Sequence, residues 1–537
     1  MLNSGVSFPT FFPNSRLGSR LARALLGSVL VLLLAGSAWA CRGAGSPEEQ
    51  HPRPAQPRLV LLYATCTLNT SFISPYNPEV SFTPRLAWLA GDGQVFARHR
   101  TEAGMSGVSF ASILSGGQAP VHGVFSHPRE LFDSVELISE AFVHDGYESF
   151  FWSYQGMASA ELNYGQGIPP ENVFPSILRG GDTRFQEIIE RLAEDPDYKA
   201  FVFANFTITH APYENNHLEA FCTAHPAECE LLGAMPDGWV DEHYELFQSS
   251  YRSFQFNLPE TIGGLGWSDQ ELDDFSELLA IIYRSNVYWL DRMFGRVVRF
   301  IDAAGLRDEA LIVFTADHGE SMYTPADLFH WSHGSSLEAE VVDVPLIIRA
   351  PGQGVEPGRV EFVTRSADVY PTIAGLAGIE IPHRPDPGPT TGVDLSGVIR
   401  GQEPAPALNA FSHTGIWPTK SLRRHAPDMK LFFEYFSESS IEQTWVALRV
   451  EDVVLKYRRD LDDEWHFEAF DLASDPTEEQ DIYDPANPLH RSMVERLRRY
   501  KVDLMSAYAV WQAQRGTPDD GLSEEDLRRL RSLGYIQ

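Results

Sequence analysis

The sequence is poor in positive charge. Its 537 residues include 42 lysines and arginines against 74 aspartates and glutamates, which gives a formal net charge of -32. Such a negative surface repels nucleic acid and anionic membranes, so we expect no binding to a phosphate backbone. An anionic substrate would need a local cation to offset this field.

Long apolar runs are also scarce, and the first one indicates export. A basic stretch with three arginines precedes an apolar run at 24–36, whose length of about 13 residues suits a signal peptide and is short for a membrane span. Ala38-Trp39-Ala40 follows as a small-x-small cleavage site. We therefore expect residues 1–40 to be a signal peptide and residues 41–57 to be a flexible tether.

The sequence has only four cysteines, and three of them bear on location and structure. Cys41 directly follows the cleavage site, which is also typical of a bacterial lipoprotein signal, so lipidation and simple secretion are equally open and an uncleaved anchor is a third alternative. Either of the first two routes leads to the periplasm or the cell surface. Cys222 and Cys229 lie seven apart in a polar segment, where a disulfide would suit an oxidising compartment and two free thiols are the alternative.

Short apolar runs alternate with helical patterns along the chain. The runs have the length and composition of buried parallel strands. They lie at 59–64, 201–208, 311–315 and 344–349. The helical patterns lie at 84–91, 109–115, 134–145, 184–194, 271–304 and 367–378. This alternation predicts an α/β fold with helices on both faces of a sheet, and such sheets bind ligands beyond the carboxyl ends of their strands.

The remaining segments suggest an insertion and a second domain. Residues 214–270 are rich in acids, aromatics, proline and glycine, and we expect them to form a lid or a pocket wall. A Pro/Gly-rich connection at 380–405 precedes three β-like runs within 444–470 and a helical stretch at 489–513. These runs predict a small antiparallel sheet. The expected domains are 58–405 and, as an α+β subdomain, 406–537.

Nine motifs in fixed order give the sequence a resemblance to the sulfatase family of the alkaline-phosphatase superfamily. The motifs are TPRLAWLAGDGQVFARH (83–99), ASILSG (111–116), VHGV (121–124), THAPY (209–213), FTADHGE (314–320), VPLIIRAPG (344–352), SADVYPTIAGLAGI (366–379), FDLASDPTEEQDI (470–482) and SLGY (532–535). The resemblance implies a central, mainly parallel sheet flanked by helices, with a small C-terminal antiparallel-sheet subdomain. It also implies hydrolysis of sulfate, phosphate or phosphonate esters, which the fold alone does not establish.

The resemblance places a divalent metal at the ends of two strands. Asp317 and His318 occupy ligand positions, with a turn aspartate and an exposed histidine as the alternative. Cys66 stands where the family has a first aspartate, Thr67 follows it, and Ser71 replaces a second aspartate. A thiolate with histidine and aspartate favours zinc or manganese over calcium. Alternatively, Cys66 is a buried thiol in a degenerate site.

Ser106 aligns with the family nucleophile. The family pattern is Cys or Ser, x, Pro, x, Arg, but Val108 and Phe110 replace its proline and arginine. We therefore expect no conversion of Ser106 to formylglycine. An unmodified serine beside a metal can still attack phosphorus, because the cation lowers the pKa of a bound hydroxyl. Two alternatives remain: Ser106 only caps the following helix, or Ser109 is the nucleophile.

Three histidines in matched motifs complete the candidate site. His210, His333 and His122 would serve as general acids or as donors to a developing oxyanion, and each alone could be structural. None of the five lysines lies in these motifs, which weakens the binding of an anionic group.

Two function classes follow: a hydrolase of small or polymeric anionic esters outside the cytoplasm, or an inactive relative that binds an anionic ligand or polymer.

Overall fold

The computed structural model describes residues 55–174, 181–325, 327–383, 387–438, 440–462, 464–516 and 523–532. The predicted signal peptide, Cys41, most of the 41–57 tether and the last three residues of the 532–535 motif lie outside this part. No helix within the described ranges combines the length and the apolar character that a membrane crossing requires.

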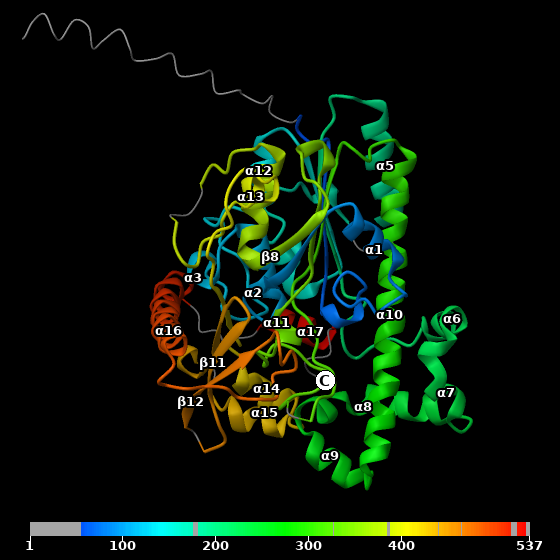
Figure 1. The fold of residues 1–537 in the computed structure, drawn as a ribbon, viewed down its shortest axis with the longest axis vertical. Coiled ribbons are helices and arrows are strands. Elements are labelled where there is room, and N and C mark those ends of the chain that lie inside the picture. Colours follow the sequence, from blue (N-terminus) through cyan, green and yellow to red (C-terminus); the bar gives the residue numbers. More distant parts are fainter. Residues whose placement is uncertain are drawn as a thin grey trace, which may run out of the picture. The chain divides into compact units, whose positions relative to one another are not determined.

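An eight-stranded sheet forms the centre of the described chain (Figure 1). Its strands, in spatial order, are β4 (Val173–Phe174), β3 (Glu148–Ser153), β5 (Ala200–Phe206), β1 (Leu59–Thr65), β6 (Ala310–Ala316), β7 (Leu346–Arg349), β2 (Gln94–Arg100) and β8 (Gly358–Arg365). All neighbouring pairs are parallel except those of β7, which runs antiparallel to β6 and β2. The predicted mainly parallel sheet is confirmed.

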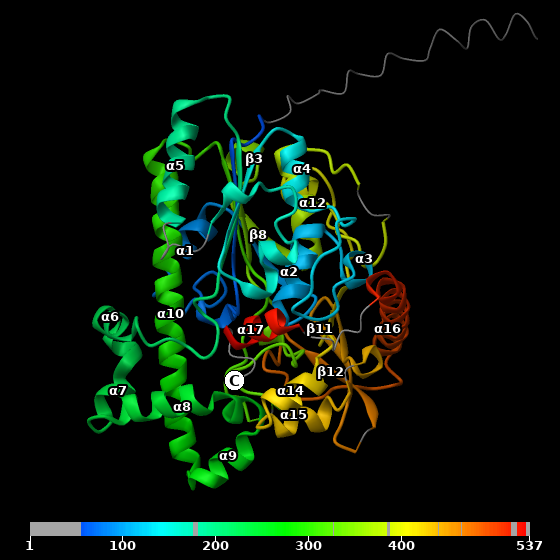
Figure 2. The same ribbon diagram turned by 180° about the vertical axis from the view of Figure 1, so that it is seen from behind.

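Helices cover both faces of this sheet because its central strands are apolar on both sides. In β1, Leu61 and Tyr63 pack into one core, while Leu62 and Ala64 pack into the other. Figures 1 and 2 show the two helical layers. The first layer holds α1 (Pro84–Gly91), α5 (Gly181–Glu194) and α10 (Asp269–Ala303); the second holds α2 (Ser106–Ser115), α4 (Ile138–His144) and α12 (Val369–Ala377).

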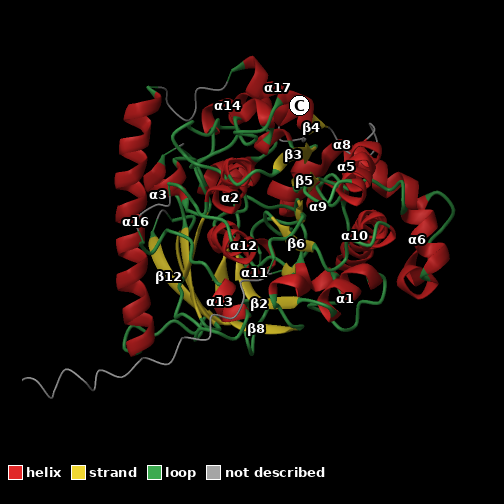
Figure 3. Ribbon diagram, turned by 90° about the horizontal axis from the view of Figure 1, so that it is seen from above, coloured by secondary structure: helices red, strands yellow, loops and turns green. Residues whose placement is uncertain are grey.

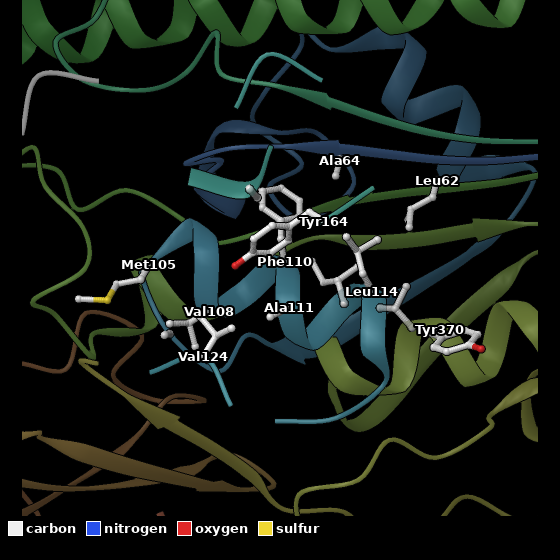
Figure 4. Close-up of a cluster of buried hydrophobic side chains, with 14 of the residues drawn as sticks. Leu62, Ala64, Met105, Val108, Phe110, Ala111, Leu114, Val124, Tyr164 and Tyr370 are labelled. Atoms are coloured by element: carbon white, nitrogen blue, oxygen red, sulfur yellow. The ribbon is translucent and has the colours of Figure 1, made fainter. Parts of the chain in front are cut away.

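Helix α2, which begins at Ser106, is completely buried against one face of the sheet. All ten of its residues are buried, and Val108, Phe110 and Leu114 belong to the same apolar core as Leu62 of β1 (Figure 4). The Phe110 ring lies 5.7 Å from that of Phe203. The residue that replaces the family arginine therefore belongs to the core. Helix α2 begins three residues earlier than the predicted range of 109–115.

A second sheet follows in the C-terminal part of the chain (Figure 3). It consists of β12 (Trp465–Asp471), β11 (Val453–Arg459), β10 (Val446–Val450) and β9 (Ala410–His413), in that order and all antiparallel. Helix α16 (Pro488–Arg515) packs on it through a separate apolar core. The small antiparallel sheet is confirmed, with β9 as a strand that the sequence did not predict.

The 214–270 insertion is helical. It forms α6 (Leu218–Ala224), α7 (Glu230–Ala234), α8 (Trp239–Phe256) and α9 (Leu258–Leu265), and the first three contact α10. The predicted disulfide between Cys222 and Cys229 is present. The other helices are α3 (Ala119–His122), α11 (Ala339–Val342), α13 (Ser396–Ile399), α14 (Thr419–His425), α15 (Lys430–Tyr435) and α17 (Glu524–Ser532).

Candidate metal centre and nucleophile

Four adjacent strands end at the candidate site. The sheet order β3-β5-β1-β6 puts the carboxyl ends of these strands side by side. Gln155 follows β3, His210 follows β5, Cys66 follows β1 and Asp317 follows β6. Parallel strands bind ligands at this edge, so the topology itself gathers the polar residues that the chain places after them.

Cys66, Asp317 and His318 are arranged as metal ligands. All three are fully buried, and one ligand atom from each lies within 4.8 Å of the others. His318 Nε2 is 3.9 Å from Cys66 Sγ and 3.5 Å from Asp317 Oδ2. Tetrahedral zinc holds neighbouring sulfur, nitrogen and oxygen ligands about 3.3 to 3.7 Å apart. The 3.5 Å separation lies within this range and the 3.9 Å separation slightly beyond it, so a zinc ion would need only a small approach of the Cys66 sulfur.

The surroundings of these ligands also suit a cation. His318 Nδ1 lies 2.9 Å from the Gly319 carbonyl, a contact that turns Nε2 toward the site. Asp317 Oδ1 accepts the main-chain N–H groups of His318 at 2.7 Å and Thr67 at 3.3 Å. Asp317 Oδ2, in contrast, is buried without a hydrogen-bond partner. A buried carboxylate oxygen of this kind is costly unless a cation balances it.

The surroundings of the Cys66 thiol favour its protonated form. Burial and, second, the neighbouring Asp317 carboxylate raise the pKa of this thiol well above its ordinary value. The sulfur would therefore lose its proton only when a strong positive charge, such as a bound divalent cation, lies next to it. Metal binding at this centre should consequently release a proton.

Ser106 lies beside the three ligands. Its Oγ is 3.4 Å from Cys66 Sγ and 3.3 Å from His318 Nε2, and it accepts a hydrogen bond from Gln155 Nε2 at 3.0 Å. The residue preceding α2 is Met105, and Ser106 is the first residue of the helix. The alternative in which Ser106 only caps the helix is therefore wrong, because its hydroxyl faces the site.

Two other predicted candidates have different roles in the structure. The Ser109 hydroxyl donates to the Ala103 carbonyl and accepts the Thr101 hydroxyl at 3.0 Å, so it stabilises the turn before α2 and does not face the ligand cluster. The Thr67 hydroxyl donates to the carbonyl of Cys66 at 2.8 Å, so this residue reaches Asp317 through its main-chain N–H. The metal-ligand prediction for its side chain has no support in these contacts.

His210 and His333 lie against the candidate centre. The His333 ring stacks on His318, with 4.5 Å between the centroids, and lies 4.8 Å from the ring of His210. Burial lowers the pKa of His210 to about 4 and that of His333 well below its ordinary value. Both rings are therefore neutral at neutral pH and carry no positive charge of their own.

His122 is not part of this group. Its Nε2 lies 3.2 Å from Glu102 and from Ser112, which is six residues beyond Ser106 on α2. His413 of β9 contacts the same Glu102 carboxylate at 3.3 Å. The prediction that His122 lines the site is wrong, because the short α3 points its ring into a second buried cluster.

The structure adds three residues that the sequence did not single out. Gln155 donates to Ser106 and also to Cys66 Sγ at 3.3 Å. Glu320 lies 3.3 Å from His333, and burial raises the pKa of its carboxyl well above the ordinary value. His127 is buried near the other imidazoles, and burial lowers its pKa to about 3. Glu320 was visible in the FTADHGE motif, whereas Gln155 follows a strand that was not predicted.

Comparison with a model of the family called Sulfatase gives a match over residues 67–379, more than half of the chain. This chain belongs to the sulfatase family. The match includes Ser106, Asp317 and His318, and Cys66 is the residue directly before it. The sulfatase family and its superfamily consist of hydrolases that typically depend on a metal, in agreement with the ligand cluster described above.

Curated and solved relatives are distant. An ulvan-active sulfatase of Formosa agariphila is 28% identical over 411 residues, covering 73% of this chain and 76% of that protein. An N-acetylglucosamine-6-O-sulfatase of Bacteroides thetaiotaomicron is 26% identical over 38% of this chain and only 32% of its own length. The phosphonate monoester hydrolase of Agrobacterium radiobacter has a TM-score of 0.56 at 19% identity, covering 85% of this chain and 96% of its own. The structural likeness confirms the fold.

Proposed function

We propose that this protein is a metal-dependent hydrolase of sulfate, phosphate or phosphonate esters in which unmodified Ser106 is the nucleophile. The observation that carries this proposal is the position of the Ser106 hydroxyl, 3.4 Å from Cys66 Sγ and 3.3 Å from His318 Nε2, beside the cluster that these two side chains form with Asp317. A serine that only supported the fold would have no need to lie beside three buried metal-ligand side chains.

Cys66, Asp317 and His318 would hold the cation. Their thiolate, carboxylate and imidazole favour zinc or manganese over calcium, which prefers several carboxylate and carbonyl oxygens. When bound, the cation lowers the pKa of a neighbouring hydroxyl and offsets the charge of an anionic ester. The buried Asp317 Oδ2 without a hydrogen-bond partner supports this assignment.

Residues of this chain then orient the attack. The Gln155 carbonyl accepts the Met157 main-chain N–H at 3.0 Å, which turns the amide nitrogen toward Ser106. Ser106 Oγ forms a bond to sulfur or phosphorus while the bond to the leaving oxygen breaks, and the serine proton passes to that oxygen, which leaves as an alcohol or phenol. Water then breaks the new bond to Oγ, which releases the sulfate, phosphate or phosphonate and restores the serine hydroxyl. The neutral rings of His210 and His333 would hydrogen-bond to the ester or its leaving oxygen.

Relatives and composition support the substrate class and the location. The relatives include sulfatases and a phosphonate monoester hydrolase, so the substrate is a small or polymeric anionic ester. The net charge of -32 argues against nucleic acid. The disulfide in the insertion supports an exported protein, periplasmic or at the cell surface, with any membrane attachment through a lipid on Cys41.

The test is turnover of an aryl sulfate, a phosphate diester and a phosphonate monoester by the purified protein with added zinc or manganese. We expect hydrolysis of at least one, its loss in Ser106→Ala, and a mass of the Ser106 peptide that corresponds to unmodified serine. If the mass of this peptide were lower by the amount that the conversion of serine to formylglycine removes, the proposal of an unmodified nucleophile would be refuted. Saturable binding of these anions without turnover would favour the inactive, ligand-binding alternative.

A further inference from the structure

The described residues enclose a cavity whose lining does not include the candidate metal ligands. Its volume is about 490 Å³, within the range of small-molecule sites. Segments 69–77 and 338–344 of the α/β part line it together with segment 472–478 that follows the second sheet. Its lining does not include Cys66, Ser106, Asp317 or His318, so it is distinct from the site of proposed hydrolysis.

The cavity wall is rich in carboxyl groups, but most of them are balanced. The lining acids are Asp327, Glu338, Glu340, Asp343 and Glu478. Lys456 Nζ lies 3.2 Å from Glu478 and 3.6 Å from Glu338. Asp343 is paired with Arg449 and, at 3.3 Å, with Arg100. Three of the acids are thus paired with three basic side chains, while Asp327 and Glu340 are in none of these ion pairs.

Asp327 and Glu340 form an acidic pair, and no ion pair to either is found within the described ranges. Their carboxyl groups are close enough to share a proton, and the nearest cation that acts on Asp327 is Lys456, which is already paired with Glu478 and Glu338. Asn69 Nδ2 and the Met322 main-chain N–H each donate to Glu340 at 3.2 Å, which fixes that carboxyl in the wall. Burial and the neighbouring carboxyls raise the pKa of both groups. A positively charged ligand would replace the protons that the pair otherwise retains.

A buried imidazole supplies the second observation. His99 lines the cavity from β2 and is only 1% exposed. Its Nδ1 is 3.0 Å from the Thr364 hydroxyl, but its Nε2 has no hydrogen-bond partner. Oε1 of the buried Glu478, also in the lining, has no hydrogen-bond partner either. Buried polar atoms without partners are costly, and a polar ligand in the cavity would satisfy both.

The spacing of these groups indicates an organic cation, not a bare metal ion. Within the described residues, Cys66, Asp317 and His318 form the one set of three metal-ligand side chains with atoms within 4.8 Å. The acids of the cavity are spread more widely, around a space of molecular size. An alkylammonium group offers several N–H donors and a carbon body, and so suits two carboxyls and an unpaired imidazole.

We propose that this cavity binds a small organic amine, with an ammonium group held between Asp327 and Glu340 and a second polar group of the ligand hydrogen-bonded to His99 Nε2. The bound amine replaces the missing cation of the wall. The site takes primary amines with a second donor in preference to quaternary ammonium ions, which have no N–H to donate.

The experiment is calorimetric titration of the full chain with putrescine, with tetramethylammonium as the ligand control. We expect saturable putrescine binding, at least about tenfold weaker in Asp327→Asn/Glu340→Gln and in His99→Leu. Unchanged affinity in Glu380→Gln, which removes an exposed acid outside the cavity, is the matched control. Circular dichroism establishes that each variant is folded, and His99→Leu leaves the acidic pair intact should the double variant not fold.

Three results would overturn the amine site. The first is no saturable binding of putrescine, and the second is equally tight binding of tetramethylammonium. The third is binding of calcium or manganese that the double variant loses and with which putrescine does not compete. Ser106→Ala separates this proposal from the proposed hydrolysis. That variant should bind putrescine as the unaltered chain does, whether or not the chain hydrolyses any ester.

Discussion

Two buried clusters of this protein contain the same side-chain types, serine, histidine and a carboxylate, yet they differ in how their polar atoms are used. In one, Ser106 and His318 lie beside Asp317 and the Cys66 thiol. In the other, Ser112 and His122 lie beside Glu102, with His413 on its other oxygen. Composition and burial do not distinguish them.

The difference lies in whether both oxygens of the carboxylate accept hydrogen bonds. In the Glu102 cluster, Oε1 accepts the Ala119 main-chain N–H at 2.7 Å, and Oε2 accepts from the Ser112 hydroxyl and from His122 Nε2. We call this group the closed cluster, because neither oxygen of Glu102 lacks a partner. In the other cluster, Asp317 Oδ2 has no hydrogen-bond partner. An incomplete buried network indicates a place for a ligand.

The largest expected effect comes from removing each serine. Ser106→Ala should lower kcat by about 10³-fold, because the nucleophile is lost while binding residues remain. Ser112→Ala, the matched control from the closed cluster, should leave kcat nearly unchanged. The measurement is steady-state kinetics on whichever of the three test esters the unaltered protein hydrolyses fastest. Equal losses of kcat in the two variants would mean that the two clusters do not differ in function.

The carboxylate of the closed cluster should govern stability. Burial alone would raise the pKa of Glu102, but hydrogen bonds from His122 and His413 lower it to about 2. Glu102→Gln should therefore cost about 3 kcal/mol of unfolding free energy, since it breaks a buried charged network. Urea unfolding measures this cost. A loss of activity in folded Glu102→Gln, without a loss of stability, would mean that the cluster is catalytic.

Gln155 should position the nucleophile without holding the metal. Gln155→Leu removes the N–H donors to Ser106 and Cys66, and we expect kcat to fall about 10- to 100-fold with KM and metal content nearly unchanged. Kinetics and metal analysis of the same preparation separate the two effects. If the variant loses its metal, Gln155 supports the ligands and not the serine.

A smaller effect concerns acid stability. Burial lowers the pKa of His99 to about 3 and that of His330 to about 4. The unfolded chain takes up these protons near pH 6.5 and the folded chain does not, so stability is complete above that pH and is lost as the pH falls toward 4. His99→Leu should reduce the slope of unfolding free energy against pH by about 1.4 kcal/mol per unit. Replacement of the exposed His144 by Gln should leave the slope unchanged.

The sequence predicted the centre of the fold well because its strands are continuous apolar runs. β1, β5 and β6 are such runs, and the polar residues after them form the site. β2, β3, β4 and β8 were missed, since their short length or their aromatic or mixed composition gives no clear apolar run. Missing β3 also hid Gln155, whose position depends on that strand being next to β5.

Residue types alone could not assign the histidines. His333 and His122 both lie in matched motifs, but only the path of the chain decides which ring faces Ser106. The same limit applies to Cys66. Its motif position favoured an inert buried thiol and left a metal ligand as the alternative, whereas the structure places its Sγ 3.9 Å from His318 Nε2.

The most direct test of this account is the metal content of the purified chain and of Cys66→Ala, measured by inductively coupled plasma mass spectrometry after dialysis against zinc and manganese. We predict about one transition-metal ion, zinc in preference to manganese, per unaltered chain and a loss of most of it in the variant. Metal-free protein, or the same metal content in Cys66→Ala, would contradict the proposed centre.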